Sequence, residues 1–219
     1  MSSGNVKHDL FAQFARIGKA LGNANRLEFI EYLAQGERSV ESLAQVSGQS
    51  IANTSQHLQQ LRQVGLVTAR KDGQRVFYRL SGDDVVQLLN CLRTVADRHL
   101  AEVDQLVTTY LNTKDHLEPV SAVDLLARAR AGEVTVLDVR PREEFAAGHL
   151  PGAINIPLNE LESRLGEFGP DQVVVAYCRG PFCVLSYDAV AQLRRHGIEA
   201  RRLEDGYPEW KLAGLPVEQ

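Results

Sequence analysis

The 219-residue sequence predicts a mainly α-helical N-terminal domain followed by an α/β C-terminal domain with a parallel sheet. The chain exceeds the usual size of one domain, and its 44% hydrophobic residues can fill two modest cores. Apolar residues recur at helical spacing through most of residues 10–111, whereas short continuous apolar runs alternate with helical stretches after residue 119. We therefore expect a domain at 1–112, a polar linker at 113–119 and a domain at 120–219.

Helical spacing defines the first elements of the chain. Apolar residues recur every three or four positions at 10–21 and again at 27–33, as on helices with one buried face. Ser39 stands where an N-cap is expected, before a short helix that breaks at Gly48. Another helix starts near Ser50. Two short helices with so tight a break predict a helix-turn-helix.

A β-hairpin and a long helix follow. Strand-like runs at 66–70 and 75–80 flank the pair Asp72-Gly73, a strong hairpin signal, and a hairpin after a helix-turn-helix is a wing. Apolar residues at 83–111 then repeat at a spacing of about 3.5 residues, which predicts one continuous helix. It is too long and apolar for one small domain to cover, so we expect it to pair two copies in a homodimer.

Charge is unevenly distributed along the chain. The net charge is -4, but residues 1–112 carry 12 basic against 11 acidic side chains, so the acidic excess lies in the second half. Within residues 50–79 five basic side chains are opposed only by Asp72. A local basic patch of this kind is expected where a protein contacts DNA phosphates.

The helix that starts near Ser50 also carries polar side chains suited to reading bases. Amides, hydroxyls and imidazoles pair with base edges in the major groove, while Lys and Arg hold phosphates. The predicted contacts to double-stranded operator DNA are Asn53, Thr54, Gln56, His57, Gln60, Arg62, Lys71 and Arg75. The alternative is that this polar helix is merely solvated.

Residues 25–80, with SLAQVSGQSIANTSQHLQQLRQVGLVTARKDGQRVFYRL at their centre, resemble the ArsR family of bacterial repressors. The resemblance implies a winged-helix homodimer that leaves operator DNA when an inducer binds, and a repressor of its own or a neighbouring operon. Members that sense soft metals carry paired cysteines before the recognition helix, and residues 40–46 contain none. Asp97 and His99 suit a second type of metal site, but its partners near residue 110 are missing. We therefore expect no metal.

The second half carries the pattern of a parallel sheet. Continuous apolar runs at 134–138 and 173–177 alternate with helical stretches such as 121–131 and 185–196, as expected for strands buried on both faces. Cys178 follows the second run, and the chain must turn before the next helix. Such a turn directs backbone N–H groups toward an anion, which lowers the pKa of a thiol. Cys178 is therefore a candidate nucleophile.

The loop after this strand has an expected role for most of its residues. Gly180 permits unusual torsions, Pro181 stiffens the turn, and Arg179 adds positive charge. Asp138 and Arg140 are expected to orient the loop from the adjacent strand. The predicted functional loop is Cys178, Arg179, Gly180, Pro181, Phe182, Cys183 and Val184, with Cys178, Arg179 and Cys183 as its candidate catalytic residues.

Three segments in order resemble rhodanese domains: VLDVRPREEFAAGHLPGAINIPL, VVVAYCRGPFCVLS and LEDGYPEWKLAGLPVE. The resemblance covers about residues 120–218 and implies that Cys178 is the sulfur-carrying cysteine. Related phosphatases and arsenate reductases close a one-residue longer loop with Arg, which grips a tetrahedral anion. Here that position is Val184, so a single sulfur atom is the expected cargo.

Three cysteines are too few for a disulfide framework and fit a reducing compartment. Cys183 is close enough to Cys178 in a curled loop to act as a resolving thiol, or it merely packs at the helix start. Cys91 lies near the apolar stripe of the long helix. It is either a small hydrophobic residue or a second sensor.

Together these features predict a cytoplasmic DNA-binding regulator, expected to be a repressor, that responds to sulfane sulfur through Cys178. Its partners would be operator DNA, a second copy and a persulfide, polysulfide or thiosulfate donor, with no cofactor and no membrane segment or signal peptide. One alternative is a rhodanese-type sulfurtransferase that its DNA-binding domain tethers or regulates. Another keeps the DNA-binding function but makes Cys91 the sensor.

Overall fold

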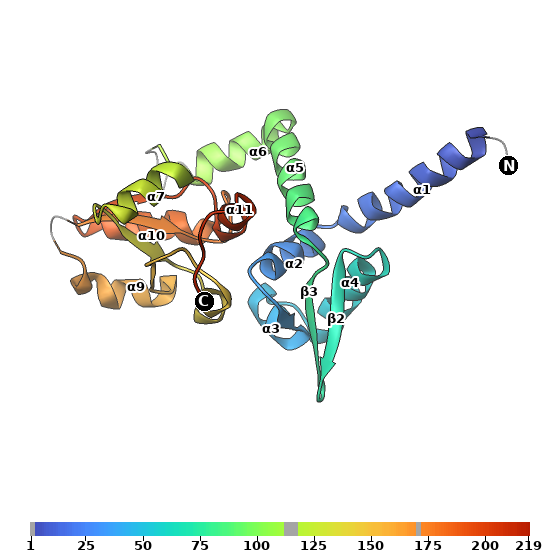
Figure 1. The fold of residues 1–219 in the computed structure, drawn as a ribbon, viewed down its shortest axis with the longest axis horizontal. Coiled ribbons are helices and arrows are strands. Elements are labelled where there is room, and N and C mark those ends of the chain that lie inside the picture. The colour runs from blue at the N-terminus through green and yellow to red at the C-terminus, as the bar shows by residue number, and fades with distance from the viewer. Residues whose placement is uncertain (1–2, 112–117, 170–171) are drawn as a thin grey trace. The chain divides into compact units, whose positions relative to one another are not determined.

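The computed structural model describes residues 3–111, 118–169 and 172–219 (Figure 1). The chain forms two compact units, Met1–Leu92 and Arg93–Gln219. The predicted fold class is confirmed, because a winged helical unit precedes a unit with a parallel sheet. Residues 113–117 of the predicted linker lie outside the described residues, so the domain boundary at residue 112 stays a prediction. No helix of the described ranges is long and apolar enough to cross a membrane.

The first unit combines helices with a small antiparallel sheet in the order β1-β3-β2. Its elements are α1 Ser3–Leu21, α2 Ala24–Ala34, β1 Arg38–Ser39, α3 Val40–Ser47, α4 Ile51–Gln63, β2 Val67–Asp72, β3 Arg75–Leu80 and the start of α5 Asp83–His99. Phe29, Ile30, Leu43, Leu58 and Leu61 are fully buried and join the helices in one core. Strand β1 was not predicted, because two residues are too few to show a periodicity.

Local capping sets the helix-turn-helix formed by α3 and α4. The Ser39 hydroxyl accepts a hydrogen bond from the Ser42 N–H at 3.2 Å, which confirms the predicted N-cap of α3. Gly48 ends α3 with φ +67, a left-handed conformation that glycine adopts readily. The Ser50 hydroxyl then caps α4 by accepting from the Asn53 N–H at 3.2 Å. The predicted break between the two helices is confirmed.

The predicted wing is present as the β2–β3 hairpin. Asp72 pairs with Arg75, so the turn consists of Gly73 and Gln74, and Gly73 has φ +59. Strand β2 extends two residues beyond the predicted end at residue 70.

The prediction of one helix over residues 83–111 is wrong. Helix α5 ends at His99, α6 spans Ala101–Leu106, and a π-helical segment follows at Val107–Leu111. Leu100 between α5 and α6 is extended, with φ -109 and ψ 106. The charges favour this break, because Arg98 and His99 complete the last turn of α5 and acidic residues occupy the first turn of α6, matching both helix dipoles.

The second unit contains a parallel sheet in the order β5-β4-β6-β7. Beyond α6 its elements are α7 Ala122–Arg130, β4 Thr135–Asp138, α8 Arg142–Ala147, β5 Ile154–Asn155, α9 Leu158–Arg164, the 3-10 turn Leu165–Glu167, β6 Val173–Tyr177, α10 Val184–Arg195, β7 Glu199–Arg202 and α11 Tyr207–Leu212. Alternate residues of β6 enter two cores, Val174 with α9 and α10 and Val175 with α7 and α11. The predicted strands, buried on both faces, are confirmed.

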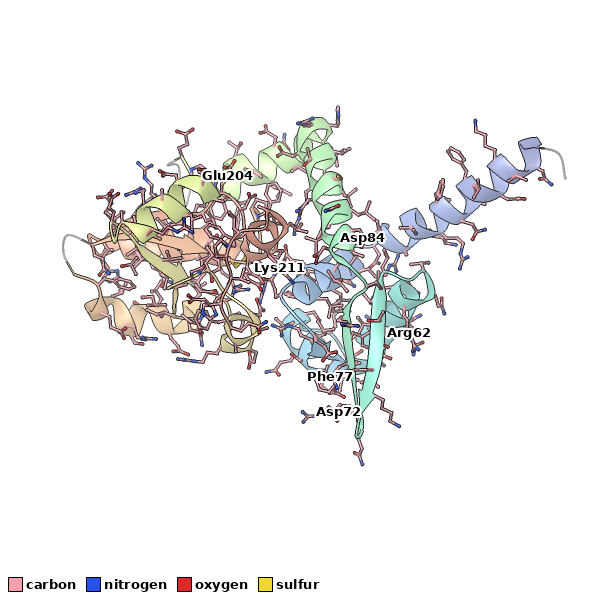
Figure 2. The ribbon with its side chains drawn as sticks, in the orientation of Figure 1. Arg62, Asp72, Phe77, Asp84, Glu204 and Lys211 are labelled. Atoms are coloured by element: carbon pink, nitrogen blue, oxygen red, sulfur yellow. A yellow bond between two sulfur atoms is a disulfide. The ribbon has the colours of Figure 1, made fainter. Side chains whose placement is uncertain are left out.

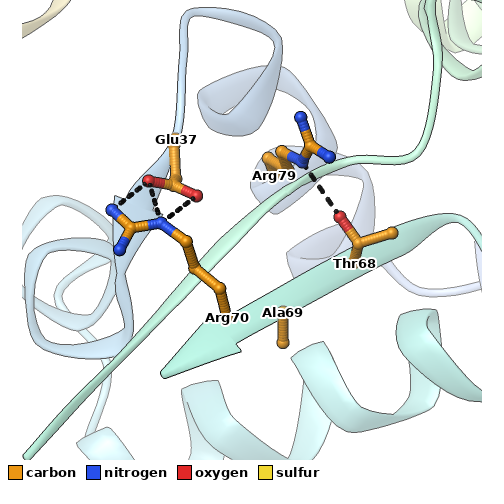
Figure 3. Close-up of a pocket in the computed structure, with 5 residues that line it drawn as sticks. All are labelled: Glu37, Thr68, Ala69, Arg70 and Arg79. Carbon is orange, nitrogen blue, oxygen red and sulfur yellow. Dashed lines mark hydrogen bonds and ion pairs between the residues drawn. The ribbon is translucent and has the colours of Figure 1, made fainter. Parts of the chain in front are cut away.

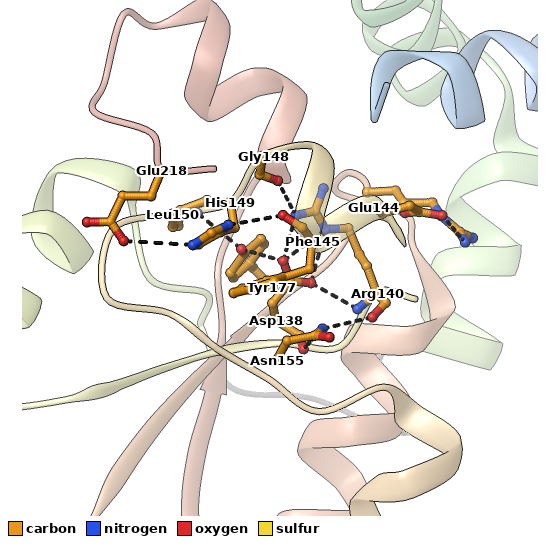
Figure 4. Close-up of polar contacts among 11 residues, drawn as sticks. Asp138, Arg140, Glu144, Phe145, Gly148, His149, Leu150, Asn155, Tyr177 and Glu218 are labelled. Atoms are coloured by element: carbon orange, nitrogen blue, oxygen red, sulfur yellow. Dashed lines mark hydrogen bonds and ion pairs between the residues drawn. The ribbon is translucent and has the colours of Figure 1, made fainter. Parts of the chain in front are cut away.

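A fully buried ion pair between Asp138 and Arg140 lies at the C-terminal end of β4, beside Tyr177 at the end of β6 (Figure 4). Arg140 Nε donates to both carboxylate oxygens of Asp138, at 3.0 and 3.1 Å, and Arg140 Nη2 donates to the Gly148 carbonyl at 2.8 Å. The Tyr177 hydroxyl donates to Asp138 and accepts from the Leu150 N–H. Burial and the Asp138 carboxylate raise the pKa of Tyr177 well above its usual value, so this hydroxyl keeps its proton.

We expect Asp138→Ala to lower the free energy of unfolding of this unit by about 3–5 kcal/mol, because it leaves the buried Arg140 guanidinium without its counter-ion. The matched control is Glu160→Gln, which breaks the solvent-exposed pair with Arg142 and should cost less than about 1 kcal/mol. Urea unfolding followed by fluorescence of the single tryptophan, Trp210, which is buried in this unit, measures both. Equal losses in the two variants would contradict the importance of the buried pair.

Candidate functional site

The sulfur loop, residues 178–183, lies between β6 and α10. Cys178 follows the last residue of β6, and Cys183 is the N-cap of α10. Both side chains are buried, with 1% and 7% of their surface exposed. The structure joins their sulfur atoms in a disulfide, and their Cα atoms are 6.1 Å apart. This Cα separation is in the usual range for a disulfide, so the loop brings the two cysteines into bonding reach.

Backbone contacts hold the sulfur loop on both sides. The Tyr207 N–H donates to the Cys178 carbonyl at 3.1 Å, and the Cys183 N–H donates to the Gly180 carbonyl at 3.1 Å. A Cβ atom on Gly206 would lie 2.3 Å from the Gly180 nitrogen, so only glycine fits against the loop there. The loop is therefore fixed by the chain just before α11 as well as by its own turn.

Arg179 does not supply free positive charge to the loop, which corrects the sequence-based expectation. Its guanidinium donates to Glu144 of α8, with Nη2–Oε1 at 2.7 Å and Nε–Oε2 at 2.9 Å. Both side chains are almost fully buried. The two charges neutralise each other, and the pair ties the sulfur loop to α8.

Asp138 and Arg140 lie where the sequence predicts, beside the residue that precedes Cys178. They contact Tyr177 through the buried network of Figure 4 rather than Cys178 itself. Pro181 and Phe182 are half-buried, and Val184 is exposed at the first turn of α10. The Pro181 carbonyl accepts from the Tyr187 hydroxyl at 3.4 Å.

The exposed face of α4 differs from the predicted DNA-reading set. Asn53, Gln56 and Arg62 are exposed, and Figure 2 shows Arg62 on this helix. Thr54 is fully buried, which contradicts its predicted contact with bases. It faces the core because it lies one turn before Leu58 on the buried side of the helix.

His57 and Gln60 are half-buried and face α2. Gln60 Oε1 accepts from Arg26 Nη1 at 2.6 Å, and the His57 ring lies 6.0 Å from that of Phe29. Burial, with a smaller contribution from the Arg26 charge, lowers the pKa of His57. These two side chains therefore help to pack α4 against α2.

Two exposed residues of α4 were missed by the sequence analysis. Gln59 and Gln63 lie three and seven positions after Gln56, so helical spacing places all three on one exposed stripe. That spacing was the signal that could have found them. On the wing, the predicted residues Lys71 and Arg75 are exposed next to the turn, and Figure 2 labels Asp72 at the same place.

A pocket of about 400 Å³ lies beside the wing and is lined by Glu37, Thr68, Ala69, Arg70 and Arg79 (Figure 3). Arg70 donates to both oxygens of Glu37 and also to Asp72, and its guanidinium lies 4.6 Å from the centre of the Phe77 ring. The Arg79 Nε donates to the Thr68 hydroxyl at 3.3 Å. Glu37 thus neutralises part of the basic patch that the sequence indicates.

Cys91 is exposed on α5 in a single copy of the chain. In the single chain, Cys91 is therefore not the buried small hydrophobic residue that one of the two interpretations predicts. Across the described ranges, no three His, Cys, Asp or Glu side chains gather closely enough to hold a metal ion.

Known proteins resemble both units. The family described as "Rhodanese-like domain" matches residues 121–213, and the family described as "Bacterial regulatory protein, arsR family" matches residues 23–69. The HTH-type transcriptional regulator Rv0324 of Mycobacterium tuberculosis is 48% identical over 213 residues, 97% of this chain and 93% of that protein.

Two further similarities each cover one half. A sulfurtransferase of Allochromatium vinosum is 34% identical over 86 residues, 39% of this chain and 78% of that protein. The solution structure of the homodimeric winged helix-turn-helix DNA-binding domain of Mb0332 from Mycobacterium bovis is 45% identical, covers 46% of this chain and 91% of that chain, and has a TM-score of 0.42. Because the match to Rv0324 spans nearly both whole chains, the protein belongs to the arsR family of bacterial transcriptional regulators and carries a rhodanese-like domain behind its DNA-binding domain.

Proposed function

We propose that this transcriptional regulator responds to sulfane sulfur through Cys178 and releases operator DNA as a repressor. The observation that carries the proposal is the pairing of Cys178 with Cys183 in the loop after β6, within a chain that also has a winged helix-turn-helix. The match to the rhodanese-like family over residues 121–213 supports sulfur as the cargo. Val184, where the related tetrahedral-anion sites need Arg, supports a single sulfur atom.

The first chemical step loads one sulfur atom onto Cys178. The Cys178 thiolate attacks a sulfur atom of an inorganic polysulfide, a new S–S bond forms, and one S–S bond of the polysulfide breaks. The shortened polysulfide leaves with the electron pair, and Cys178 becomes a persulfide. Asp138 and Arg140 support this step as positioning residues, because their buried network holds Tyr177 directly before Cys178.

The second step uses Cys183 as the resolving thiol. The Cys183 thiolate attacks the Cys178 Sγ atom, the Cys178–Cys183 disulfide forms, and the outer sulfur leaves as sulfide. Two thiols are oxidised and one sulfane sulfur is reduced, so the reaction balances without another oxidant. The proposed product is a Cys178–Cys183 disulfide, and the contact between the two sulfur atoms in the structure supports this step.

DNA binding in this account uses α4 in the major groove and the wing on the backbone. The exposed stripe Gln56, Gln59 and Gln63 offers amides to base edges, and Arg62, Lys71 and Arg75 offer positive charge to phosphates. Asn53, exposed at the start of α4, completes the proposed set.

A homodimer is supported by apolar side chains that one copy leaves exposed. They lie on α1 and α5 and include Leu10 at 52%, Phe11 at 59%, Phe14 at 60%, Leu88 at 38% and Leu92 at 39%. Exposed clusters of large apolar side chains are typical of surfaces that bind another protein chain. The proposed occupant is a second copy of the chain.

A second function, sulfur transfer as an enzyme, is favoured by one observation, the similarity of the second unit to a sulfurtransferase. Turnover of thiosulfate with a thiol acceptor separates the two functions. An enzyme that is merely tethered to DNA would turn over at the same rate with and without operator. In a sensor the two events are coupled, so bound operator shifts the equilibrium between the dithiol and disulfide forms of Cys178 and Cys183.

Cys178 should be required for operator binding to respond to sulfane sulfur. Operator affinity is measured at fixed salt, with and without inorganic polysulfide, on a duplex that the protein selects from a random-sequence library. We expect polysulfide to weaken binding roughly tenfold or more in the parent and in Cys91→Ser, and to leave Cys178→Ser unchanged. An unchanged response in Cys178→Ser together with a lost response in Cys91→Ser would move the sensor to Cys91.

A Cys183 variant should separate the two chemical steps. In the parent, polysulfide should yield the disulfide and release one sulfide for each chain. Cys183→Ser should instead stop at the persulfide, which is about 32 Da heavier, the mass of one sulfur atom. Intact-mass spectrometry and a sulfide assay measure both. A disulfide product of unchanged yield in Cys183→Ser would exclude Cys183 as the resolving thiol.

Substitutions on α4 and on the wing should separate base reading from phosphate contact. Gln59→Ala should weaken binding of the selected duplex by about 1–3 kcal/mol while binding of unrelated DNA stays constant. Lys71→Gln should weaken both and reduce the salt dependence of binding by about one charge for each copy. The control is Glu162→Gln, an exposed residue of α9 in the second unit. Equal effects of Gln59→Ala on both DNAs would remove Gln59 from base reading.

A further inference from the structure

Arg93, in the C-terminal part of α5, lies against the sulfur loop. It is the first residue of the second compact unit, which therefore includes the C-terminal part of α5. Arg93 Nη1 lies 3.4 Å from Glu209 Oε1, and the two side chains are only 17% and 11% exposed. A Cβ atom on Gly180 would lie 3.2 Å from the same Nη1 atom, so the guanidinium rests against the backbone of the loop.

Glu209 links Arg93 to a second point beside the loop. Its Oε2 atom accepts a hydrogen bond from the Gly206 N–H at 3.1 Å, so one carboxylate holds both the guanidinium and the start of α11. A carboxylate that accepts charge-assisted hydrogen bonds from two fixed partners can occupy only a small range of positions. Moving Gly206 therefore displaces Glu209, and with it Arg93.

Gly206 in turn lies directly on the loop. A Cβ atom there would come within 2.4 Å of the Arg179 carbonyl carbon and within 2.6 Å of the Gly180 Cα atom. The next residue, Tyr207, donates its N–H to the Cys178 carbonyl. A shift of residues 178–180 has no free space toward Gly206, so it is passed on to α11.

We expect the proposed sulfur chemistry to produce such a shift. Cys178 and Cys183 are buried and pack in the core formed with α9 and α10. Opening their bond separates two atoms from bonding distance to van der Waals distance, and a persulfide adds one more atom. A close-packed interior has no room for either change without movement of the loop.

We propose that Arg93 is the positioning residue through which the sulfur state of Cys178 reaches α5. The inference rests on the proposed function, because it needs Cys178 to change state. Helix α5 also carries the exposed apolar residues Leu88, Leu92 and Val95. Leu88 and Leu92 belong to the proposed dimer contact, and Val95 follows them at helical spacing. Arg93 thus lies on the helix that carries part of the proposed dimer contact and also reaches the sulfur loop.

Linkage gives this proposal a second observable. If the state of Cys178 changes operator affinity by some factor, then operator DNA changes the equilibrium of the Cys178–Cys183 pair by the same factor. Both factors should fall to about one when Arg93, the proposed coupling residue, is replaced. A residue that only stabilised the fold would lower both affinities and leave their ratio intact.

The test measures the ratio of operator dissociation constants between the disulfide and dithiol forms of the full chain. Inorganic polysulfide prepares the disulfide form, dithiothreitol prepares the dithiol form, and intact mass confirms each. We expect a ratio of roughly tenfold or more in the parent and about one in Arg93→Gln, with disulfide formation preserved in the variant. Arg98→Gln, an exposed arginine of the same helix, is the matched control and should keep the parental ratio.

The outcomes separate the inference from the proposed function. A parental ratio in Arg93→Gln would overturn the role of Arg93 while Cys178 sensing stands. A ratio of one in the parent itself would overturn the proposed function. If Arg93→Gln does not fold, Glu209→Gln gives the same test, because its amide oxygen still accepts from Gly206 while the charge that holds Arg93 is gone; a parental ratio there overturns the inference.

Discussion

The second unit depends on the buried pair of Asp138 and Arg140. A guanidinium with no exposed surface is tolerated only because Asp138, the Gly148 carbonyl and nearby aromatic rings surround it, with the Tyr207 ring centre 4.5 Å away. These partners belong to the ends of β4 and β6, the turn after α8 and the start of α11. The Arg140 guanidinium therefore fixes the segments that border the sulfur loop. Tyr177, which hydrogen-bonds to Asp138, holds the backbone directly before Cys178.

The charges near Cys178 restrict what the loop can bind. Arg179 is paired with Glu144, and Arg93 is paired with Glu209, so neither guanidinium offers an unshared charge to a bulky anion. Cys178 itself is almost fully buried. A small cargo that bonds covalently to sulfur suits this site better than a tetrahedral anion that needs several charged donors. The position of Val184 at the start of α10 agrees with this preference.

The features that could be predicted from the sequence are those that local chemistry decides. Ser39, Gly48 and Gly73 act through their own backbone and nearest neighbours, so the caps, the helix-turn-helix and the wing were predicted correctly. The buried strands could be predicted because both of their faces are apolar. Cys178 could be placed at the end of β6 for the same reason.

Two kinds of feature could not be predicted: ion pairs between residues far apart in the sequence, and which polar residues of a helix face the core. Glu144 lies 35 positions before Arg179, and Glu209 lies 116 positions after Arg93, so neither pair leaves a sequence signal. Thr54 is polar but occupies a buried position of α4, while Gln59 was overlooked on the exposed side. The break at Leu100 was missed because the apolar repeat continues across it, although the charges on either side indicated two helix ends.

The proposed function requires sulfur chemistry at Cys178 and operator binding to be coupled in one molecule. Native mass spectrometry of a sample partly treated with polysulfide, mixed with a limiting amount of selected operator duplex, tests it directly. The masses of DNA-bound and free protein report the state of the Cys178–Cys183 pair in each population. We expect chains with the Cys178–Cys183 disulfide to be enriched in the free population. The same fraction of disulfide in the free and DNA-bound populations would show that the two events are not coupled.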